Sequence, residues 1–367
     1  MATTMNHYTP PVAFHPGETL AEKLEEMGMS IKEFAIRVTK TEKTIIAIIR
    51  GDSSITSDMA VSFESVTQIP AHFWMNKQRV YDEYIAREKR ERLIQESVEW
   101  IKLFPINDMI KKGWLSPCKN TGEKVYQIFS FFGVSTPKAW EDYYFNQQLK
   151  VAFRISLANT KEPYAISAWL RQGELQAIKQ IANTPYSDKK LKEILPEMKK
   201  LMVAQPDNFP FQLQKLCLQA GVKLVYTPCL PKAPINGATR WIGDYPCIQL
   251  SGRHNRNDIF WFSFFHEVGH ILLHGKKDIF LEDIEYTDKQ IKKEQEADNF
   301  AEKMTLTKSE EAEIINSKDY STQSIKRFAK KINTHPAIIV GRLQHLKIID
   351  YWQDQQLIEK IDLFKDV

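Results

Sequence analysis

Cysteine is scarce in this chain of 367 residues, and long apolar runs are missing. The four cysteines have no short paired spacing, which excludes a disulfide framework and a Cys-based zinc site and predicts reduced thiols. No apolar run approaches the roughly 18 residues that a membrane helix needs, so we expect no membrane partner. The first residues also lack the basic start and apolar core of a signal peptide. These absences predict a cytoplasmic protein.

The chain also lacks a strong excess of one charge. Its 50 lysines and arginines nearly balance its 46 aspartates and glutamates, which gives a net charge of +4. This value permits a local basic patch for nucleic acid but does not by itself indicate one. The apolar fraction of 43% and the charged fraction of 26% are typical of a globular protein. The length predicts roughly two or three domains.

A histidine pair stands in an apolar stretch of helical length. His266, Glu267 and His270 follow Trp261–Phe265 and precede Ile271–Leu273. Residues four apart lie on one face of a helix, so the two imidazoles point the same way, with the carboxylate of Glu267 beside them. Two imidazoles one turn apart can chelate zinc, and the neighbouring carboxylate can accept a proton from the bound water. A buried helix whose histidines only form hydrogen bonds would show the same residues, so a third ligand must decide.

A third ligand is available downstream. A helix is predicted there, because apolar residues recur at i, i+3, i+4 and i+7: Ala297, Phe300, Ala301 and Met304. Glu296 borders this apolar face, where a carboxylate needs a partner or a metal ion. Two histidines and one glutamate, with water in the fourth position, make the open zinc site of hydrolytic enzymes. We therefore expect zinc, or alternatively manganese, at His266, His270 and Glu296. Glu294 is the alternative ligand, although we expect it further round the polar side.

Neighbouring polar residues complete the predicted site. Asp298 is a candidate to orient a ligand imidazole through a hydrogen bond. His274 shares the helix face of His270 and is expected to pack there or to support a ligand. The segment 278–293, acidic and then basic, is expected to form a surface loop near the cleft.

These two motifs resemble those of a known family. His-Glu-x-Gly-His-x-Leu-Leu-His spans residues 266–274, and Glu-x-Glu-Ala-Asp-x-Phe-Ala spans residues 294–301. The pattern is similar to that of the ImmA/IrrE metallo-endopeptidases, gluzincin-like proteins that act on transcriptional repressors. The resemblance extends over residues 205–305 and implies a protein substrate. The residues that match the zinc ligands and the general base of that family are His266, His270, Glu296 and Glu267.

The first part of the chain carries the signals of short helices. Ser30 and Thr41 are N-cap residues, and Gly51 ends the helix that follows Thr41. Helices are predicted over Ile31–Val38 and Glu42–Arg50, joined by a tight turn. Five short helices within about 75 residues describe a helix-turn-helix domain, which we place at residues 12–88. Its predicted core residues are apolar: Phe34, Ala35, Val38, Ile45, Ile48 and Ile49.

This domain resembles the XRE helix-turn-helix family and, within it, the HigA-type antitoxins. The matching stretches are His-Pro-Gly-Glu at 15–18, Ile-Thr-Ser-Asp-Met-Ala at 55–60 and Phe-Trp-Met-Asn-Lys-Gln at 73–78. The resemblance implies a cognate toxin as partner and operator DNA at the promoter of its own gene. Helix-turn-helix regulators are usually dimers, so we expect a homodimer.

The third helix of this domain decides whether it contacts DNA. Four residues on or beside its groove-facing side are candidate DNA contacts: Lys40, Lys43, Thr44 and Arg50. Other residues argue against strong operator binding. Glu42 would repel phosphates, Ile46 can read only a thymine methyl group, and Thr39 replaces the glycine usual in the turn. The alternative is a helix-turn-helix scaffold used for dimerisation or partner docking.

The fold class predicted for the whole chain is mainly α with a small antiparallel β-sheet (α+β). A helical connector is expected over residues 89–204, and the metallopeptidase domain over residues 205–310. Residues 311–367 are expected to form a helical subdomain that packs against it.

The predicted sheet lies before the histidine motif. Strands are expected over Val222–Tyr226, Gly237–Ile242 and Pro246–Ser251, the last two as an antiparallel hairpin. The first strand of this hairpin is the candidate edge to which a substrate chain adds as a further strand. Arg240 and His254 are the candidates to polarise the scissile carbonyl, and the sequence does not select between them.

These patterns lead to competing functions. In the first, a DNA-binding regulator carries a zinc-dependent endopeptidase that cleaves a repressor, a toxin partner or itself, with Glu267 as general base. In the second, the protein is a non-catalytic antitoxin or repressor of a toxin–antitoxin operon, and the zinc domain is a sensor or an interaction module. The third is a toxin-binding protein without DNA contact.

Overall fold

The computed structural model describes residues 13–147, 162–231, 233, 235–275, 280–281 and 288–364. The chain divides into two compact units, Met1–Glu96 (unit 1) and Ser97–Val367 (unit 2). In the part of the chain that the structure describes, no helix is both long and apolar enough to cross a membrane.

Unit 1 contains the predicted helix-turn-helix. Its described helices are α1 (Pro16–Glu26), α2 (Ile31–Arg37), α3 (Glu42–Ile49), α4 (Ser57–Thr67) and α5 (Ala71–Glu96). The side chains of Ser30 and Thr41 cap α2 and α3, as the sequence predicted. In the turn between them, Thr39 adopts a φ of 51°, in the left-handed region that favours glycine.

The core of unit 1 contains the apolar residues that the sequence predicted, although Ile49 is only partly buried. Trp74 of α5 is fully buried among them. Gln78, one turn further along α5, is also buried and accepts a hydrogen bond of 2.8 Å from the backbone amide of Ile55. A buried amide without a partner is costly, so Gln78 fixes the residues before α4 against α5. This contact joins two of the stretches that resemble the antitoxins.

Unit 2 combines a small sheet with many helices. The helices that precede the sheet are α6 (Val98–Ile101), α7 (Ile106–Lys111), α8 (Thr121–Phe132), α9 (Pro137–Glu141), the π-helix η1 (Asp142–Gln147), α11 (Pro163–Lys179), α12 (Asp188–Ala204) and α13 (Phe209–Gln219). The strands are β1 (Lys223–Tyr226), β2 (Gly237–Ile242), β3 (Tyr245–Leu250) and β4 (Phe280–Leu281). The remaining helices are α14 (Asn257–His274), α15 (Asp288–Thr305), α16 (Lys308–Ser317), α17 (Thr322–Ile332), α18 (Pro336–His345) and the 3-10 helix η2 (Gln355–Leu357).

The sheet is mixed, with the strand order β1-β3-β2-β4. The predicted hairpin is confirmed, because β2 and β3 pair antiparallel with Gly237 opposite Leu250. β1 pairs parallel to β3, so the sheet is not purely antiparallel as expected. β1 and β2 are therefore not neighbours in the sheet, although they follow each other in the chain. β3, which follows β2 through the hairpin turn, lies between them.

The segment 278–293 is not the simple loop that the sequence predicted. Its residues 280–281 form β4, which pairs with Ala238 and Thr239 of β2, and α15 already begins at Asp288. Residues 278–279 and 282–287 lie outside the described residues.

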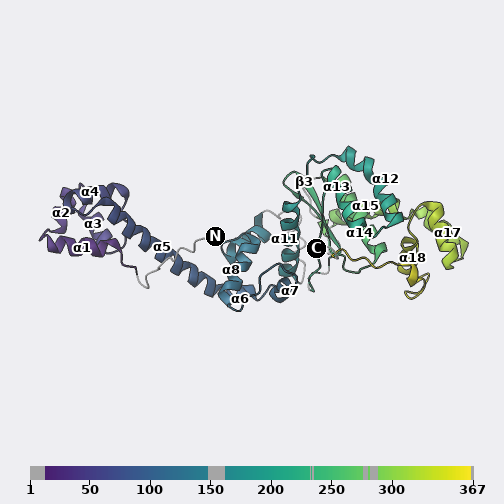
Figure 1. The fold of residues 1–367 in the computed structure, drawn as a ribbon, viewed down its shortest axis with the longest axis horizontal. Helices are drawn as coiled ribbons and strands as arrows, with labels where there is room; N and C mark the ends of the chain where they lie inside the picture. The colour runs from purple at the N-terminus through teal and green to yellow at the C-terminus, as the bar shows by residue number, and fades with distance from the viewer. Residues whose placement is uncertain are drawn as a thin grey trace. The chain divides into compact units, whose positions relative to one another are not determined.

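Helices cover both faces of the sheet (Figure 1). On the α11 face, Gln249 of β3 and Lys223 of β1 donate hydrogen bonds of 2.7 Å each to backbone carbonyls of α11. On the α14 face, Oγ1 of Thr239 donates one of 3.2 Å to the backbone carbonyl of Glu267. From Ser97 onward, the segment expected to be a connector therefore belongs to the same unit as the sheet and the histidine helix.

Gly17 in the first turn of α1 lies against α3, and we predict that Gly17→Ala destabilises unit 1. A Cβ atom at this position would lie 1.9 Å from the carbonyl oxygen of Ile48. Relief of this overlap requires a shift of α1 or α3, which we expect to cost about 1–3 kcal/mol of unfolding free energy. Amide hydrogen exchange of peptides from residues 16–67 measures the effect in the full chain.

The matched control is Glu22→Ala, at an exposed position of the same helix. It should change the unfolding free energy by no more than about 0.5 kcal/mol. Equal exchange rates in the two variants would show that the contact between Gly17 and Ile48 is not tight.

Candidate metal centre

α14 is the most deeply buried helix of the site. The apolar run that the sequence placed around the histidines packs into the core of unit 2, where Phe264, Phe265 and Val268 are fully buried. The helix carries its polar residues inward with it: His266 is 3% exposed and His270 is 1% exposed. Buried polar groups need partners, and these come from α15.

α15 runs along α14 at a short distance. A Cβ atom at Gly269 would lie 3.2 Å from the Cα of Ala297 and 3.2 Å from the Cβ of Phe300, so a larger residue would require these neighbours to move by a few tenths of an ångström. Ala297 is itself fully buried. Gly269 on α14 and Ala297 on α15 are small, so the two backbones can approach each other. Side chains one helical turn before these two residues then come into contact.

The side chains that meet are two imidazoles and one carboxylate. The Nε2 atoms of His266 and His270 lie 2.9 Å apart. Oε2 of Glu294 lies 3.2 Å from Nε2 of His266, and Oε1 lies 3.5 Å from Nε2 of His270. The three residues offer ligand atoms within 4.8 Å of one another, which is close enough for one ion.

Glu294 stands where the sequence analysis placed Glu296. Each residue of a helix turns by about 100°, so Glu294 lies about 60° from Ala297, on the side of Ala301, and Glu296 lies about 100° away on the opposite side. Ala301 is fully buried, whereas Phe300, which appeared to extend the apolar face toward Glu296, is only partly buried. The expectation that Glu294 lies further round the polar side was wrong for this reason.

Outer contacts orient both imidazoles. Nδ1 of His266 lies 2.9 Å from Oδ1 of Asp298, the role that the sequence analysis gave to this aspartate. Nδ1 of His270 lies 3.0 Å from Nδ1 of His274, whose Nε2 lies 3.0 Å from Oε2 of Glu296. Glu296 therefore supports the third histidine instead of lying between the first two. A proton on Nδ1 of His266, shared with the carboxylate, leaves a lone pair on Nε2, the form that binds metal.

Burial and hydrogen bonds set the charges of the cluster. Burial lowers the pKa of His270 to about 4, so this imidazole is neutral at pH 7. Burial alone would raise the pKa of Glu294, but hydrogen bonds with His266 and His270 lower it to about 2. A neutral imidazole and an ionised carboxylate are the protonation states that metal binding requires.

Glu267 is fully buried and approaches the sheet. A Cβ atom at Gly237 would lie 2.6 Å from Oε1 of Glu267, so the glycine leaves the space that this carboxylate occupies. The sequence analysis did not find this role of Gly237. The signal was a glycine inside a predicted strand, which often marks the close approach of another group.

The residues fit a divalent metal ion. Two imidazole nitrogens and one carboxylate are a donor set of zinc in hydrolytic enzymes, and manganese accepts the same donors. Zinc binds imidazole nitrogen at about 2.0–2.1 Å, so nitrogens 2.9 Å apart can both reach one ion. Without a cation or a proton between them, the two lone pairs would repel each other.

Arg240 does not lie with the histidines. It is buried, and its guanidinium donates a hydrogen bond to the backbone carbonyl of Leu170 in α11. Side chains alternate along a strand, so Arg240 points to α11, whereas Gly237 and Thr239 face α14. The structure thus contradicts a role for this arginine at the scissile carbonyl.

The candidate substrate edge is also displaced. β4 pairs with β2 at Ala238 and Thr239, so β4 and not β2 is the edge of the described sheet on this side. No pattern in the sequence indicates β4, because a two-residue strand is too short for an alternating pattern.

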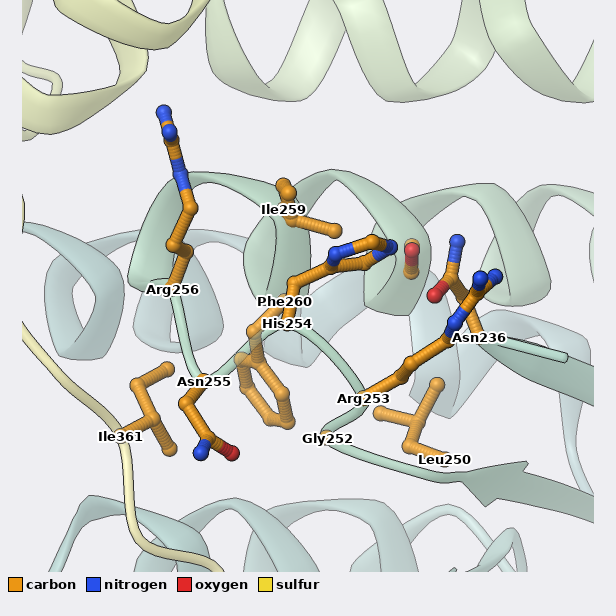
Figure 2. A pocket seen from close by; sticks show the side chains of 11 residues that line it. Asn236, Leu250, Gly252, Arg253, His254, Asn255, Arg256, Ile259, Phe260 and Ile361 are labelled. Atoms are coloured by element: carbon orange, nitrogen blue, oxygen red, sulfur yellow. The ribbon is translucent and has the colours of Figure 1, made fainter. Parts of the chain in front are cut away.

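His254 remains a candidate contact for substrate. It is exposed in the loop between β3 and α14 and lines a small cavity together with Asn236 and Ser263. Figure 2 shows its ring and the side chain of Arg253 directed toward Asn236, while Arg256 points away from them. Ser263 precedes Glu267 by one helical turn, so a group held at this cavity is near the metal centre.

In unit 1, the predicted DNA contacts surround α3. Lys43 and Arg50 are exposed, and Thr44 takes part in the N-cap of the helix. Lys40 forms an ion pair of 2.7 Å with Asp58 of α4. An exposed pair of this kind is weak, so a phosphate can compete for the lysine.

Comparison with known proteins finds a family model that matches the region of the candidate metal centre. The model of the IrrE N-terminal-like domain, peptidase family M78, matches residues 217–343. The match includes α14 and α15, which supply the clustered residues, and β2, which contains Gly237.

Other comparisons find helix-turn-helix proteins. Virulence-associated protein I of Dichelobacter nodosus is 32% identical over 82 residues, which cover 22% of this chain and 76% of that protein. The uncharacterised HTH-type transcriptional regulator YddM of Escherichia coli (strain K12) is 27% identical over 66 residues, 18% of this chain and 70% of that protein. A solved structure of Pseudomonas aeruginosa antitoxin HigA with the higBA promoter is 30% identical, covers 23% of this chain and 94% of its own, and has a TM-score of 0.22.

We predict that Glu294→Gln weakens zinc binding far more than Glu296→Gln. Loss of the charged oxygen at Glu294 would remove a carboxylate placed to bind the ion directly, whereas loss of an outer partner alone typically costs about 10–100-fold in affinity. Glu294→Gln should therefore lose about 100-fold or more, and Glu296→Gln about 10-fold or less. Competition with a chromophoric zinc chelator measures both affinities. The reverse order would assign the ligand to Glu296.

Proposed function

We propose that this chain is a metal-dependent endopeptidase joined to a DNA-binding regulator of the HigA type, and the match of residues 217–343 to the IrrE N-terminal-like domain of peptidase family M78 supports the peptidase half. The observation that carries the peptidase half is the cluster of His266, His270 and Glu294 with Glu267 beside it. Its substrate would be a protein: a repressor, a cognate toxin or a second copy of this chain.

Each residue of the site would have a separate role in peptide hydrolysis. His266, His270 and Glu294 would hold zinc, or manganese in its place. When bound, such an ion acts as a Lewis acid that makes a water molecule acidic near pH 7 and polarises a carbonyl. Glu267 accepts the proton of the attacking water and passes it to the departing amide nitrogen. Asp298 keeps the imidazole of His266 in its metal-binding orientation.

We predict that Glu267→Gln abolishes cleavage and leaves metal binding intact. The amide cannot accept a proton, and loss of a general base typically lowers the rate by about 100–10,000-fold. The measurement is the intact mass of the full chain after incubation with zinc or manganese, alone and with the proteins encoded beside its gene. Metal analysis of the same samples reports on the site itself.

Glu197→Gln, on the exposed face of α12, is the control and should cleave like the wild type. Undiminished cleavage by Glu267→Gln would rule out the proposed proton transfer. Full metal content without any fragment from the wild type would favour a non-catalytic antitoxin or repressor with a metal sensor.

The DNA-binding half of the proposal rests on α3. The helix presents Lys43 and Arg50 to solvent, and Lys40 can exchange its exposed aspartate partner for a phosphate. The partner would be operator DNA, bound by a homodimer, because each helix-turn-helix of a dimer reads one half-site. The resemblance to HigA-type antitoxins implies a cognate toxin as a further partner.

We predict that Lys43→Ala weakens binding to the DNA upstream of the gene and lowers the salt dependence by about one ion. Gel shifts at several salt concentrations measure both quantities. Lys89→Ala, which removes an equal charge from an exposed position of α5, should leave both unchanged. No sequence-dependent shift by the wild type would point to toxin or partner docking without DNA contact.

A further inference from the structure

We propose that a groove beside the metal centre is the subsite that selects a bulky apolar side chain of an extended polypeptide substrate. The proposal rests on the peptidase function above and specifies the chemistry of its substrate. The groove lies between α14, α15 and α18 and has a volume of about 480 Å³. We call it the α14–α18 groove.

The groove adjoins the metal centre. Asp298, whose carboxylate contacts His266, is part of its wall. Ser263, also in the wall, lies one helical turn before His266 and Glu267. From Ser263 the wall follows α14 back to Arg256, a stretch of helix that rises about 10 Å. This length corresponds to about three residues of an extended chain, so a peptide at the metal can place its neighbouring residues in the groove.

The inner wall of the groove is apolar. Ile259 and Phe262 of α14 line one side, and Leu306 and Ile338 line the others. Ile259 and Phe262 remain partly exposed, although they lie on the helix at the centre of unit 2. Removal of apolar surface from water is favourable by about 25 cal/mol per Å². An apolar substrate side chain is therefore the ligand that this wall stabilises most.

The two arginines of the groove already have partners of opposite charge. Arg256 donates hydrogen bonds of 3.0 and 2.9 Å to the two carboxylate oxygens of Asp258. Arg342 forms an ion pair with Glu311 and lies 3.7 Å from Glu302. An acidic or basic substrate residue would have to compete with these pairs. These ion pairs therefore do not favour a charged substrate side chain in the groove.

The far wall is fixed by direct helix packing. A Cβ atom at Gly341 of α18 would lie 2.0 Å from Oδ2 of Asp258 on α14, so the two helices touch at this glycine. The C-terminal helices were expected only to pack against the catalytic domain. Their position beside Ile259 gives them a part in substrate selection.

Dipeptide hydroxamates test the subsite, because the hydroxamate binds a catalytic metal and leaves the side chains free to report on the groove. The probes contain one glycine and one phenylalanine, leucine, glutamate or lysine, in both orders, and are titrated into the zinc-loaded full chain by calorimetry. We expect phenylalanine or leucine to bind about tenfold or more tightly than glutamate or lysine in one of the two orders.

Two substitutions of Ile259 locate this preference. Ile259→Trp fills the groove and should abolish the preference at unchanged zinc content. Ile259→Arg places a cation there and should shift the preference to glutamate, which a folding defect would not do. Ile178→Trp, at an exposed position of α11, is the matched control and should bind like the wild type.

The outcomes separate this inference from the proposed function. Equal binding of all probes, unchanged by Ile259→Trp, would overturn the subsite and leave the metal centre intact. Failure of every probe to bind the zinc-loaded wild type would overturn the proposed metal chemistry, and the subsite with it.

Discussion

The close contact of α14 with α15 at Gly269 and Ala297 is the constraint on which the site depends. A carboxylate on a glutamate side chain has a short reach, so it meets an imidazole of a neighbouring helix only where the backbones are near. Glu294 lies one turn before Ala297, and His266 lies one turn before Gly269. The pair of small residues therefore lets a carboxylate of α15 reach the imidazoles of α14, and the rotation of α15 determines that this carboxylate is Glu294.

Burial gives the cluster its chemical character. The two imidazoles and Glu267 lie away from water, where an ionised group is stable only beside partners that compensate its charge. Glu294 stays ionised because both imidazoles contact it, and His270 stays neutral because burial disfavours its charged form. These states leave nitrogen and oxygen lone pairs that converge on one point. A divalent cation satisfies all of them at once, which is the physical reason to expect an ion there.

The sequence predicted where the helices and strands of this site lie in the chain, but not which face of each element points to the site. Hydrophobic periodicity and caps located the helices, and the spacing of His266 and His270 placed both on one face. The choice between Glu294 and Glu296 depended on which residues of α15 lie at the centre of its buried face. Phe300 was counted as part of that face and favoured Glu296, but its side chain is only partly buried. The direction of Arg240 depended on which face of β2 meets α14, and an alternating pattern does not reveal that when both faces are covered by helices.

Tertiary packing also explains why the sequence analysis predicted the C-terminal helices but not their place beside the groove. The resemblance found in the sequence is specific only up to residue 305, before α16 begins. The family match nevertheless continues to residue 343, through α17 and most of α18. Gly341 shows why these helices belong to the functional unit, since its contact with Asp258 holds α18 beside the N-terminal half of α14. A peptidase must hold several residues of its substrate as well as the scissile bond. In the peptidase that we propose, this surface would extend from the candidate metal centre along α14 to α18.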